Sequence, residues 1–508
     1  MSTTLAPIPD HATVGRRMPA ARDLLVVLGV AAAVGAAAGA RPLLVLLIGA
    51  AVIVGAAVLL RPDVATVVVV FLLYSNVIGV MIEFHGLTAS VGIVLPMLLI
   101  APLMYHVLVR EERFRQPPAF GWVLVFLFVQ LLATIFATDV AVATGTVQVF
   151  IFEGLVVYLL VPNVIRTSRL LVAAVWAIVI AAAMLSVISI IQVVLRDYGN
   201  DFLGFAQTSE VAQQRLETGE KSQVPVEGPI GDKNRYAQLL LVAVPLGLFL
   251  YWSARSTLAR LGGLLAAVIT SLAVFFTLSR GAALGFLVLL VVMTFLRYIR
   301  VRHLVTLLVA LTVLLVAVPA YKDRISTLGV VPALFSPEAE ATNSQTDSSL
   351  RSRATEALIA LLMFADHPVL GVGPGLYPAH YLEYADDAFR RSDVLAVNVK
   401  ESRREAHSAY LGLLSEMGIL GVCAFLGFLT AMLGALVRAR RRCLSFDPRL
   451  GHLVTGILLA VVAYLATATF LHLAYIRYFW LLMGLAAAAI LVVEREADEA
   501  ARRPAEAP

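Results

Sequence analysis

Residues 170–195 read LLVAAVWAIVIAAAMLSVISIIQVVL, a stretch without a charged side chain that is bounded by Arg169 and Arg196. A helix rises about 1.5 Å per residue, so these 26 residues would extend for about 39 Å. The hydrocarbon core of a bilayer is about 30 Å thick and needs about 20 apolar residues to cross it. We therefore expect this stretch to span a membrane as one helix.

The same apolar character continues through the whole chain of 508 residues. Hydrophobic residues make up 60% of the sequence and charged residues only 14%, whereas soluble domains average about 45–50% and about 25%. This composition excludes soluble, disordered and fibrous proteins. The net charge of +5 could suggest nucleic-acid binding. The basic residues, however, lie between the apolar stretches, as in membrane proteins, so we expect no nucleic-acid partner.

Fourteen apolar stretches have a suitable length, and proline and charged residues separate them. The predicted spans are 24–40, 43–60, 64–82, 88–109, 119–137, 146–162, 170–195, 236–253, 261–277, 282–296, 304–320, 409–437, 451–471 and 475–493. Twelve spans fit equally well if one pair re-enters the membrane. The predicted fold class is an all-α, polytopic membrane protein with about 12–14 transmembrane helices.

The basic residues predict the orientation. If the N-terminus is cytoplasmic, the segments on that side carry 22 of the 39 lysines and arginines, and the short outer turns carry only 3. The other 14 lie in two long outer loops, which the positive-inside rule does not count. We therefore expect both termini in the cytoplasm and an even number of spans.

These spans divide the chain into seven predicted segments. They are a cytoplasmic tail at 1–23, transmembrane helices at 24–195, an outer loop at 196–235, further transmembrane helices at 236–320, a large outer loop at 321–408, C-terminal transmembrane helices at 409–493 and a cytoplasmic tail at 494–508. Within the large loop, residues 351–366 have the periodicity of a helix. Its predicted apolar face is Ala354, Leu358, Leu361 and Ala365.

Two arginines on the predicted outer face could bind an anion. Arg280 lies in a turn between two spans, at the membrane edge, where its guanidinium could hold a phosphate or simply reach the interface. Arg353 opens the loop helix beside Arg351, and an arginine in a first helical turn is unfavourable for the helix dipole. The outer face has no ATP supply, so an enzyme there needs an activated substrate.

Other polar residues lie close to the ends of the two outer loops. His407 directly precedes a predicted span. Its imidazole could act as a general base, or it could pack at the membrane interface. Glu416, inside that span, needs a partner and could pair with an arginine or orient the site. Lys233 and Arg235 could bind a diphosphate or anchor their helix. The histidines and aspartates of the large loop lack the close spacing of a zinc site, so we expect no metal.

Four motifs occur in a fixed order: TLSRGA at 277–282, Arg353 followed by Ala357 and Leu358, DHPVLGVGPG at 366–375, and HSAYL at 407–411 with EMG at 416–418. In this order the chain resembles the O-antigen ligase/polymerase family of bacterial membrane glycosyltransferases. The likeness covers roughly residues 230–440.

The resemblance implies a GT-C-like fold in the bacterial plasma membrane and an active site on its outer face. The donor would be a polyprenyl-diphosphate-linked glycan, and no nucleotide sugar, metal or other cofactor would be needed. The arginines of the family correspond to Arg280 and Arg353, and its histidine corresponds to His407. Two positions depart from the family pattern: Ser408 stands where asparagine is frequent, and Glu356 where tryptophan is frequent.

The acceptor stays open at this point. Our first interpretation is a surface polysaccharide polymerase, whose acceptor is another glycan. The alternative is an O-antigen ligase that transfers to a lipid A core or to a protein. A lipid-linked glycan flippase or transporter is the alternative of another class, but such proteins place polar groups near the membrane midplane. Here most polar residues lie in the outer loops, and we favour an enzyme surrounded by membrane lipids.

Overall fold

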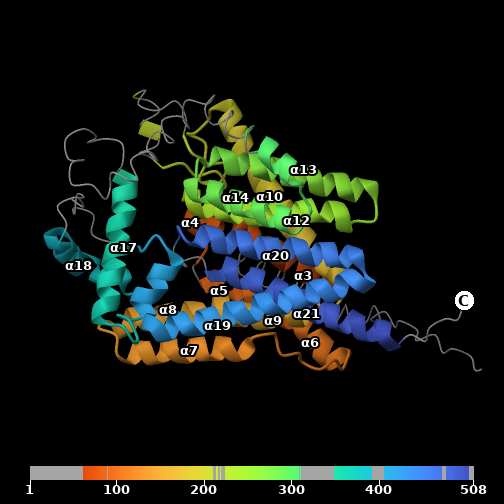
Figure 1. Ribbon diagram of the computed structural model, residues 1–508, viewed down its shortest axis with the longest axis horizontal. Coiled ribbons are helices and arrows are strands. Elements are labelled where there is room, and N and C mark those ends of the chain that lie inside the picture. The colour runs from red at the N-terminus through yellow and green to blue at the C-terminus, as the bar shows by residue number, and fades with distance from the viewer. Residues whose placement is uncertain are drawn as a thin grey trace, which may run out of the picture. The chain divides into compact units, whose positions relative to one another are not determined.

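The computed structural model describes residues 61–88, 90–209, 224–307, 348–391, 405–471 and 476–502, with isolated positions 213, 214, 218 and 309. Within these ranges helices are the only regular secondary structure (Figure 1). The all-α prediction is confirmed. The predicted spans 24–40 and 43–60 lie outside the described residues, and 304–320 lies mostly outside them.

The helices follow the apolar stretches of the sequence. They are α3 (Pro62–Ser75), α4 (Val77–His85), α5 (Ser90–Met97), α6 (Ile100–Met104), α7 (Phe120–Ile135), α8 (Val140–Val149), α9 (Val156–Val164), α10 (Ser168–Leu195), α12 (Lys233–Ser253), α13 (Thr257–Phe276), α14 (Arg280–Phe295), α17 (Ser348–Asp366), α18 (Tyr377–Arg391), α19 (Ala409–Phe446), α20 (Pro448–Ala468) and α21 (Ile476–Arg502). Two π-helical turns, η1 (Tyr105–Val109) and η2 (Phe150–Leu155), and one 3₁₀ turn, η3 (Gly228–Ile230), complete the set.

Seven of the described helices are long and apolar enough to cross a membrane. α3 and α4, which are bent by 55° at Asn76, make an eighth if they form one broken span. Three shorter apolar helices, at Leu95–Val109, Phe120–Ile135 and Arg280–Phe295, occupy further predicted spans. The chain is a polytopic membrane protein, and the full count of 12–14 spans stays a prediction.

α12, α20 and α21 form the interior of the helical bundle. About four fifths of the membrane-span residues in each of these helices are buried. α12 packs against α13, α14 and α20, and α21 packs against α9 and α19. Where α9, α19 and α21 meet, the Tyr158 ring makes edge-to-face contacts with Phe428 and Trp480, whose ring centroids lie 5.1 Å apart. Interlocked aromatic rings of this kind fix how the helices rotate against one another.

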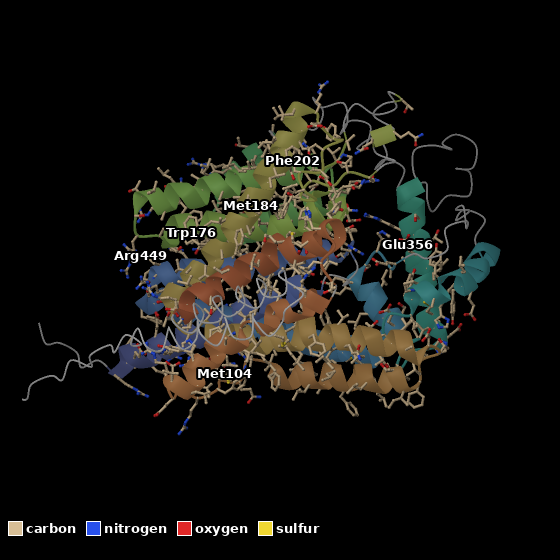
Figure 2. All side chains as sticks on the ribbon, turned by 180° about the vertical axis from the view of Figure 1, so that it is seen from behind. Met104, Trp176, Met184, Phe202, Glu356 and Arg449 are labelled. Atoms are coloured by element: carbon tan, nitrogen blue, oxygen red, sulfur yellow. The ribbon has the colours of Figure 1, made fainter. Side chains whose placement is uncertain are left out.

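Three helices begin at one end of the bundle, each with a polar cap. The side chains of Asp232, Ser279 and Ser408 accept backbone N–H groups in the first turns of α12, α14 and α19. We call this end the loop end, because α17 and α18 lie there. α12 and α19 finish at the other end, near Arg255 and Arg449, which we call the basic end. Figure 2 shows Glu356 and Arg449 at these opposite ends.

α17 runs across the direction of the long helices (Figure 1). It ends at Asp366 as predicted and begins at Ser348, three residues before the predicted start. The predicted apolar face is wrong, because Leu361 is 47% exposed while Ile359, Ala360 and Met363 are fully buried. The helix is apolar nearly all round at 357–364, so periodicity alone does not choose between neighbouring faces. The face is chosen by α18, whose Tyr377 packs on Ile359 and Met363 in a small second core.

α19 is broken at Gly418, where φ is 58° and ψ is −161°. In an unbroken helix the N–H groups of Ile419 and Leu420 would bond to the carbonyls of Ser415 and Glu416. Here those N–H groups donate to Pro368 and Val369, at 2.9 and 3.3 Å.

The loop segment 368–373 also satisfies the two carbonyls that the break releases. The N–H groups of Val372 and Gly373 donate to the carbonyls of Ser415 and Glu416, at 2.9 and 3.0 Å. A Cβ atom on Gly371 would lie 2.3 Å from the Glu416 carbonyl carbon. Only glycine permits this approach. The DHPVLGVGPG motif therefore holds the break in α19 and fixes the large loop to the bundle.

Candidate functional site

Arg280 is the first residue of α14, and its place is set by a very short turn. α13 ends at Phe276, Leu278 takes a left-handed conformation with φ of 53°, and Ser279 caps α14. The Ser279 hydroxyl also donates to the Asn234 side-chain oxygen at 2.8 Å. This bond joins the starts of α12 and α14 and holds the Arg280 backbone at the loop end.

Arg353 lies on α17 and shares the electrostatic environment of Arg280. Burial lowers the pKa of the Arg353 guanidinium, and the positive charge of Arg280 lowers it further. The carboxylates of Glu356 and Asp232 act in the opposite direction. Arginine side chains carry a positive charge at physiological pH. The loop helix thus brings a second arginine to the start of α14, where two like charges favour the binding of an anion.

His407 is held by a buried carboxylate. Its Nδ1 lies 2.9 Å from the Glu356 Oε2 and 3.0 Å from the Glu405 carbonyl oxygen. A carbonyl oxygen can only accept, so Nδ1 carries a proton and the other ring nitrogen, Nε2, holds the lone pair when the ring is neutral. The Glu356 side chain is 3% exposed and the His407 ring 42% exposed. The imidazole therefore has one anchored edge and one accessible edge.

The same contact changes the basicity of the ring. The hydrogen bond to Glu356 raises the pKa of His407 above its ordinary value, although burial and the positive charge of Arg353 act against it. Ser352 donates to the other oxygen of the Glu356 carboxylate at 2.9 Å. Arg353 and Glu356 are three residues apart on α17, which puts them on one side of the helix. One helical turn thus supplies an anion-binding charge and the partner of the histidine.

Arg235 and Lys233 lie at the start of α12 and have neighbours of opposite charge. Arg235 forms an ion pair with Glu405, two residues before His407. Burial raises the pKa of the Glu227 carboxyl, and the positive charge of Lys233 offsets part of this increase. Both residues therefore lie at the loop end, and Arg235 helps to fasten the segment that carries His407. Their predicted role in binding a diphosphate stays a prediction.

Glu416 occupies a different place, at the break in α19. Its Oε1 accepts the backbone N–H of Tyr377 at 3.2 Å and so caps the start of α18. The Tyr377 hydroxyl in turn donates to the Glu356 carbonyl at 2.8 Å. This contact makes Glu416 a positioning residue for the loop, and its predicted role in substrate binding stays a prediction. Arg351 lies on α17, two residues before Arg353, and its role also stays a prediction.

The arrangement has the parts that a transfer reaction with an anionic leaving group requires. Arg280 and Arg353 can stabilise negative charge that develops on a phosphate. The accessible Nε2 of His407 can take a proton from a hydroxyl group. Glu356 completes the site, yet the sequence marked it only as a departure from a family pattern. The available signal was a carboxylate on a predicted helix, three residues after a candidate arginine.

Comparison with known proteins finds a match in the region that contains these residues. Residues 265–426 match the family model described as O-antigen ligase, a region that covers about a third of the chain and contains Arg280, Arg353 and His407. A search of curated proteins gives no match to the chain. The family that the chain resembles is thus the O-antigen ligase family, and the likeness lies in residues 265–426.

Proposed function

We propose that this protein transfers or polymerises a polyprenyl-diphosphate-linked oligosaccharide at the outer face of the bacterial plasma membrane. The observation that carries the proposal is the site at the loop end. The charge of Arg280 acts on Arg353, the charge of Arg353 acts on His407, and the His407 Nδ1 lies 2.9 Å from the buried Glu356 carboxylate. This combination suits the departure of an anion and the deprotonation of a hydroxyl group in the same step.

The arginines would hold the donor. A diphosphate carries several oxygens, and a guanidinium can bind two of them in parallel. Arg280 starts the short apolar helix α14, which occupies a predicted span, so its side chain would lie where the headgroup of a membrane-anchored carrier is found. When the sugar leaves, the negative charge on the diphosphate grows, and fixed positive charges stabilise that state more than the ground state.

His407 would act as the base of a direct displacement. The acceptor oxygen attacks the anomeric carbon, and the bond from that carbon to the diphosphate oxygen breaks, so the electron pair leaves with the polyprenyl diphosphate. The proton of the acceptor hydroxyl goes to Nε2 of His407. Glu356 holds Nδ1 and stabilises the imidazolium that forms, as a carboxylate does for the histidine in hydrolase triads. One displacement of this kind inverts the anomeric configuration.

Our first choice of acceptor is another glycan, which makes the protein a surface polysaccharide polymerase. A second candidate is favoured by one observation, the description of the matching family model as O-antigen ligase. In that case the acceptor is a lipid A core or a protein.

The test uses Arg280→Ala, Arg353→Ala and His407→Ala variants in the native host. Surface glycan is analysed on a gel, and the amount of protein in the membrane is measured by immunoblot. Lipid-linked oligosaccharide is extracted and quantified by mass spectrometry. Arg300→Ala and His303→Ala are matched controls, because both side chains are exposed at the basic end. We expect the three site variants to reach the membrane and to accumulate unused donor, while both controls behave as wild type.

The products separate the remaining alternatives. Acceptors that carry a single repeat identify a polymerase, whereas full-length polymer left on the polyprenyl carrier identifies a ligase. Normal glycan from all three site variants would overturn the proposed mechanism. Donor that accumulates only on the cytoplasmic leaflet would instead identify a flippase.

A further inference from the structure

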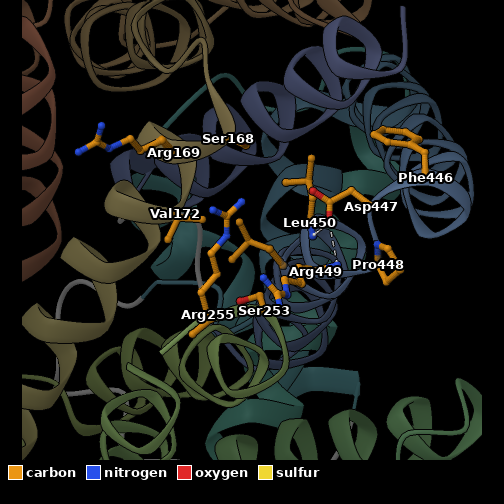
Figure 3. A pocket seen from close by; sticks show the side chains of 12 residues that line it. Ser168, Arg169, Val172, Ser253, Arg255, Phe446, Asp447, Pro448, Arg449 and Leu450 are labelled. Carbon is orange, nitrogen blue, oxygen red and sulfur yellow. Dashed lines mark hydrogen bonds between the residues drawn. The ribbon is translucent and has the colours of Figure 1, made fainter. Parts of the chain in front are cut away.

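A cavity of about 830 Å³ lies at the basic end, away from the candidate site. It is bounded by the start of α10, the ends of α12 and α19, and the start of α20 (Figure 3). Because α12 and α19 run from the candidate site to this cavity, the two sites are separated by the length of the helices. The proposed transfer reaction therefore leaves the cavity without a role.

Three arginines line the cavity: Arg169, Arg255 and Arg449. Figure 3 shows Arg255 and Arg449 extending into it from two helix ends, with Arg169 to one side. Among the described residues no acidic side chain forms an ion pair with any of the three. The one carboxylate in the lining, Asp447, accepts the backbone N–H groups of Arg449 and Leu450, at 3.0 and 3.2 Å. The cavity thus keeps a positive charge.

A buried hydroxyl group gives a second, independent indication of a polar ligand. The Oγ of Ser253 is buried in the lining, and within the described part of the chain no group forms a hydrogen bond with it. A buried polar atom without a partner is costly and rare in folded proteins. A ligand with acceptor oxygens would satisfy this donor together with the arginines.

The lining also contains apolar side chains. They are Val172, Phe446, Leu450 and Leu453, at the level where the long helices end. A ligand that matches both kinds of side chain has an anionic, oxygen-rich head and apolar chains. Basic cavities between transmembrane helices bind phospholipid headgroups in this way.

We propose that this cavity binds a phosphate group, supplied by the headgroup of an anionic phospholipid in the leaflet at the basic end. Arg255 and Arg449 hold the phosphate oxygens, Ser253 donates one hydrogen bond, and the apolar side chains of the lining contact the upper part of an acyl chain. The inference does not depend on the proposed glycan transfer, because it concerns other residues at the opposite end of the bundle.

The test measures lipid retention by the full-length protein in nanodiscs of phosphatidylcholine with rising fractions of phosphatidylglycerol. Native mass spectrometry counts the bound phosphatidylglycerol of wild type and of an Arg255→Gln, Arg449→Gln double variant. Each arginine near a membrane surface contributes about fivefold to the attraction of anionic lipid, so we expect the double variant to bind about 30-fold more weakly. Its melting temperature in pure phosphatidylcholine should equal that of wild type.

The matched control is an Arg300→Gln, Arg441→Gln double variant, which removes the same charge from exposed positions at the same end. It should retain phosphatidylglycerol as wild type does. A second arm adds inorganic phosphate to protein in pure phosphatidylcholine. Stabilisation there, with displacement of phosphatidylglycerol, would assign the phosphate site to a soluble ligand. Equal lipid retention by the cavity variant and the control variant would overturn the inference.

Discussion

Replacing Glu356 by glutamine should move the acidic limb of the rate–pH profile to lower pH. The Glu356 carboxylate favours the protonated imidazole of His407 and so raises its pKa. Glutamine keeps the shape and a hydrogen-bonding group but removes the charge, so the pKa of His407 falls. A general base works in its unprotonated form. The variant should therefore stay active at a pH where wild type is already losing activity.

The magnitude follows from the 2.9 Å contact and its surroundings. A hydrogen bond to a charged group contributes about 1.5–3 kcal/mol, and the lower value applies because the His407 ring is 42% exposed. Losing about 1.4 kcal/mol of imidazolium stabilisation corresponds to about a tenfold loss of rate, and the acidic limb moves to lower pH. On the alkaline plateau the rate should fall by about tenfold, because the base is weaker and less well oriented.

The assay uses membranes that contain the variant, lipid-linked oligosaccharide extracted from the native host, and product analysis by gel between about pH 5 and 9. Glu383→Gln is the matched control. That residue forms another histidine–glutamate pair in the described part of the loop, with His380 at 3.1 Å, but its side chain is 71% exposed. The control profile should coincide with wild type. If the limb of Glu356→Gln stays in place or moves to higher pH while membrane levels are normal, His407 is not the base.

Three further predictions concern the arginine site and the loop. Arg353→Lys keeps the charge but loses paired hydrogen bonds, so activity should fall about 100-fold in the membrane assay, with membrane levels unchanged. Gly371→Ala places a Cβ 2.3 Å from the Glu416 carbonyl carbon at φ of +68°, so the melting temperature in detergent should drop sharply. Gly145→Ala, with no atom within 4 Å of the new Cβ, should leave it unchanged. Glu416→Gln weakens the cap of α18 by about 1 kcal/mol, so hydrogen exchange should become faster at Tyr377, and unchanged exchange would contradict the capping role.

Several parts of the structure are local enough to be predicted from the sequence. Apolar runs bounded by arginine and proline coincide with helices, and α17 ends at Asp366, just before the predicted stop at Pro368. The turn that carries Arg280 is as short as its sequence indicates. Each of these features is decided by neighbouring residues, through membrane thickness, proline geometry and helix capping.

Contacts between distant segments could not be predicted in the same way. Glu356 and His407 are 51 positions apart, and nothing in the periodicity of α17 indicates that its polar turn meets the start of α19. The break at Gly418 lies in a stretch that reads as one uninterrupted span, because Gly412 and Gly421 nearby remain helical. Only the loop segment 368–373, which takes over the hydrogen bonds, distinguishes Gly418 from the other two.

The break in α19 also has a consequence for how the protein is made. α19 cannot complete its own hydrogen bonds, since two N–H groups and two carbonyls near Gly418 depend on residues 368–373. Unpaired backbone groups are very costly in hydrocarbon. Residues 368–373 are synthesised before α19, so their partner groups exist when the helix leaves the ribosome. A circular permutant that is translated from α19 onward would insert this helix before those partners exist, and its yield of folded protein should fall.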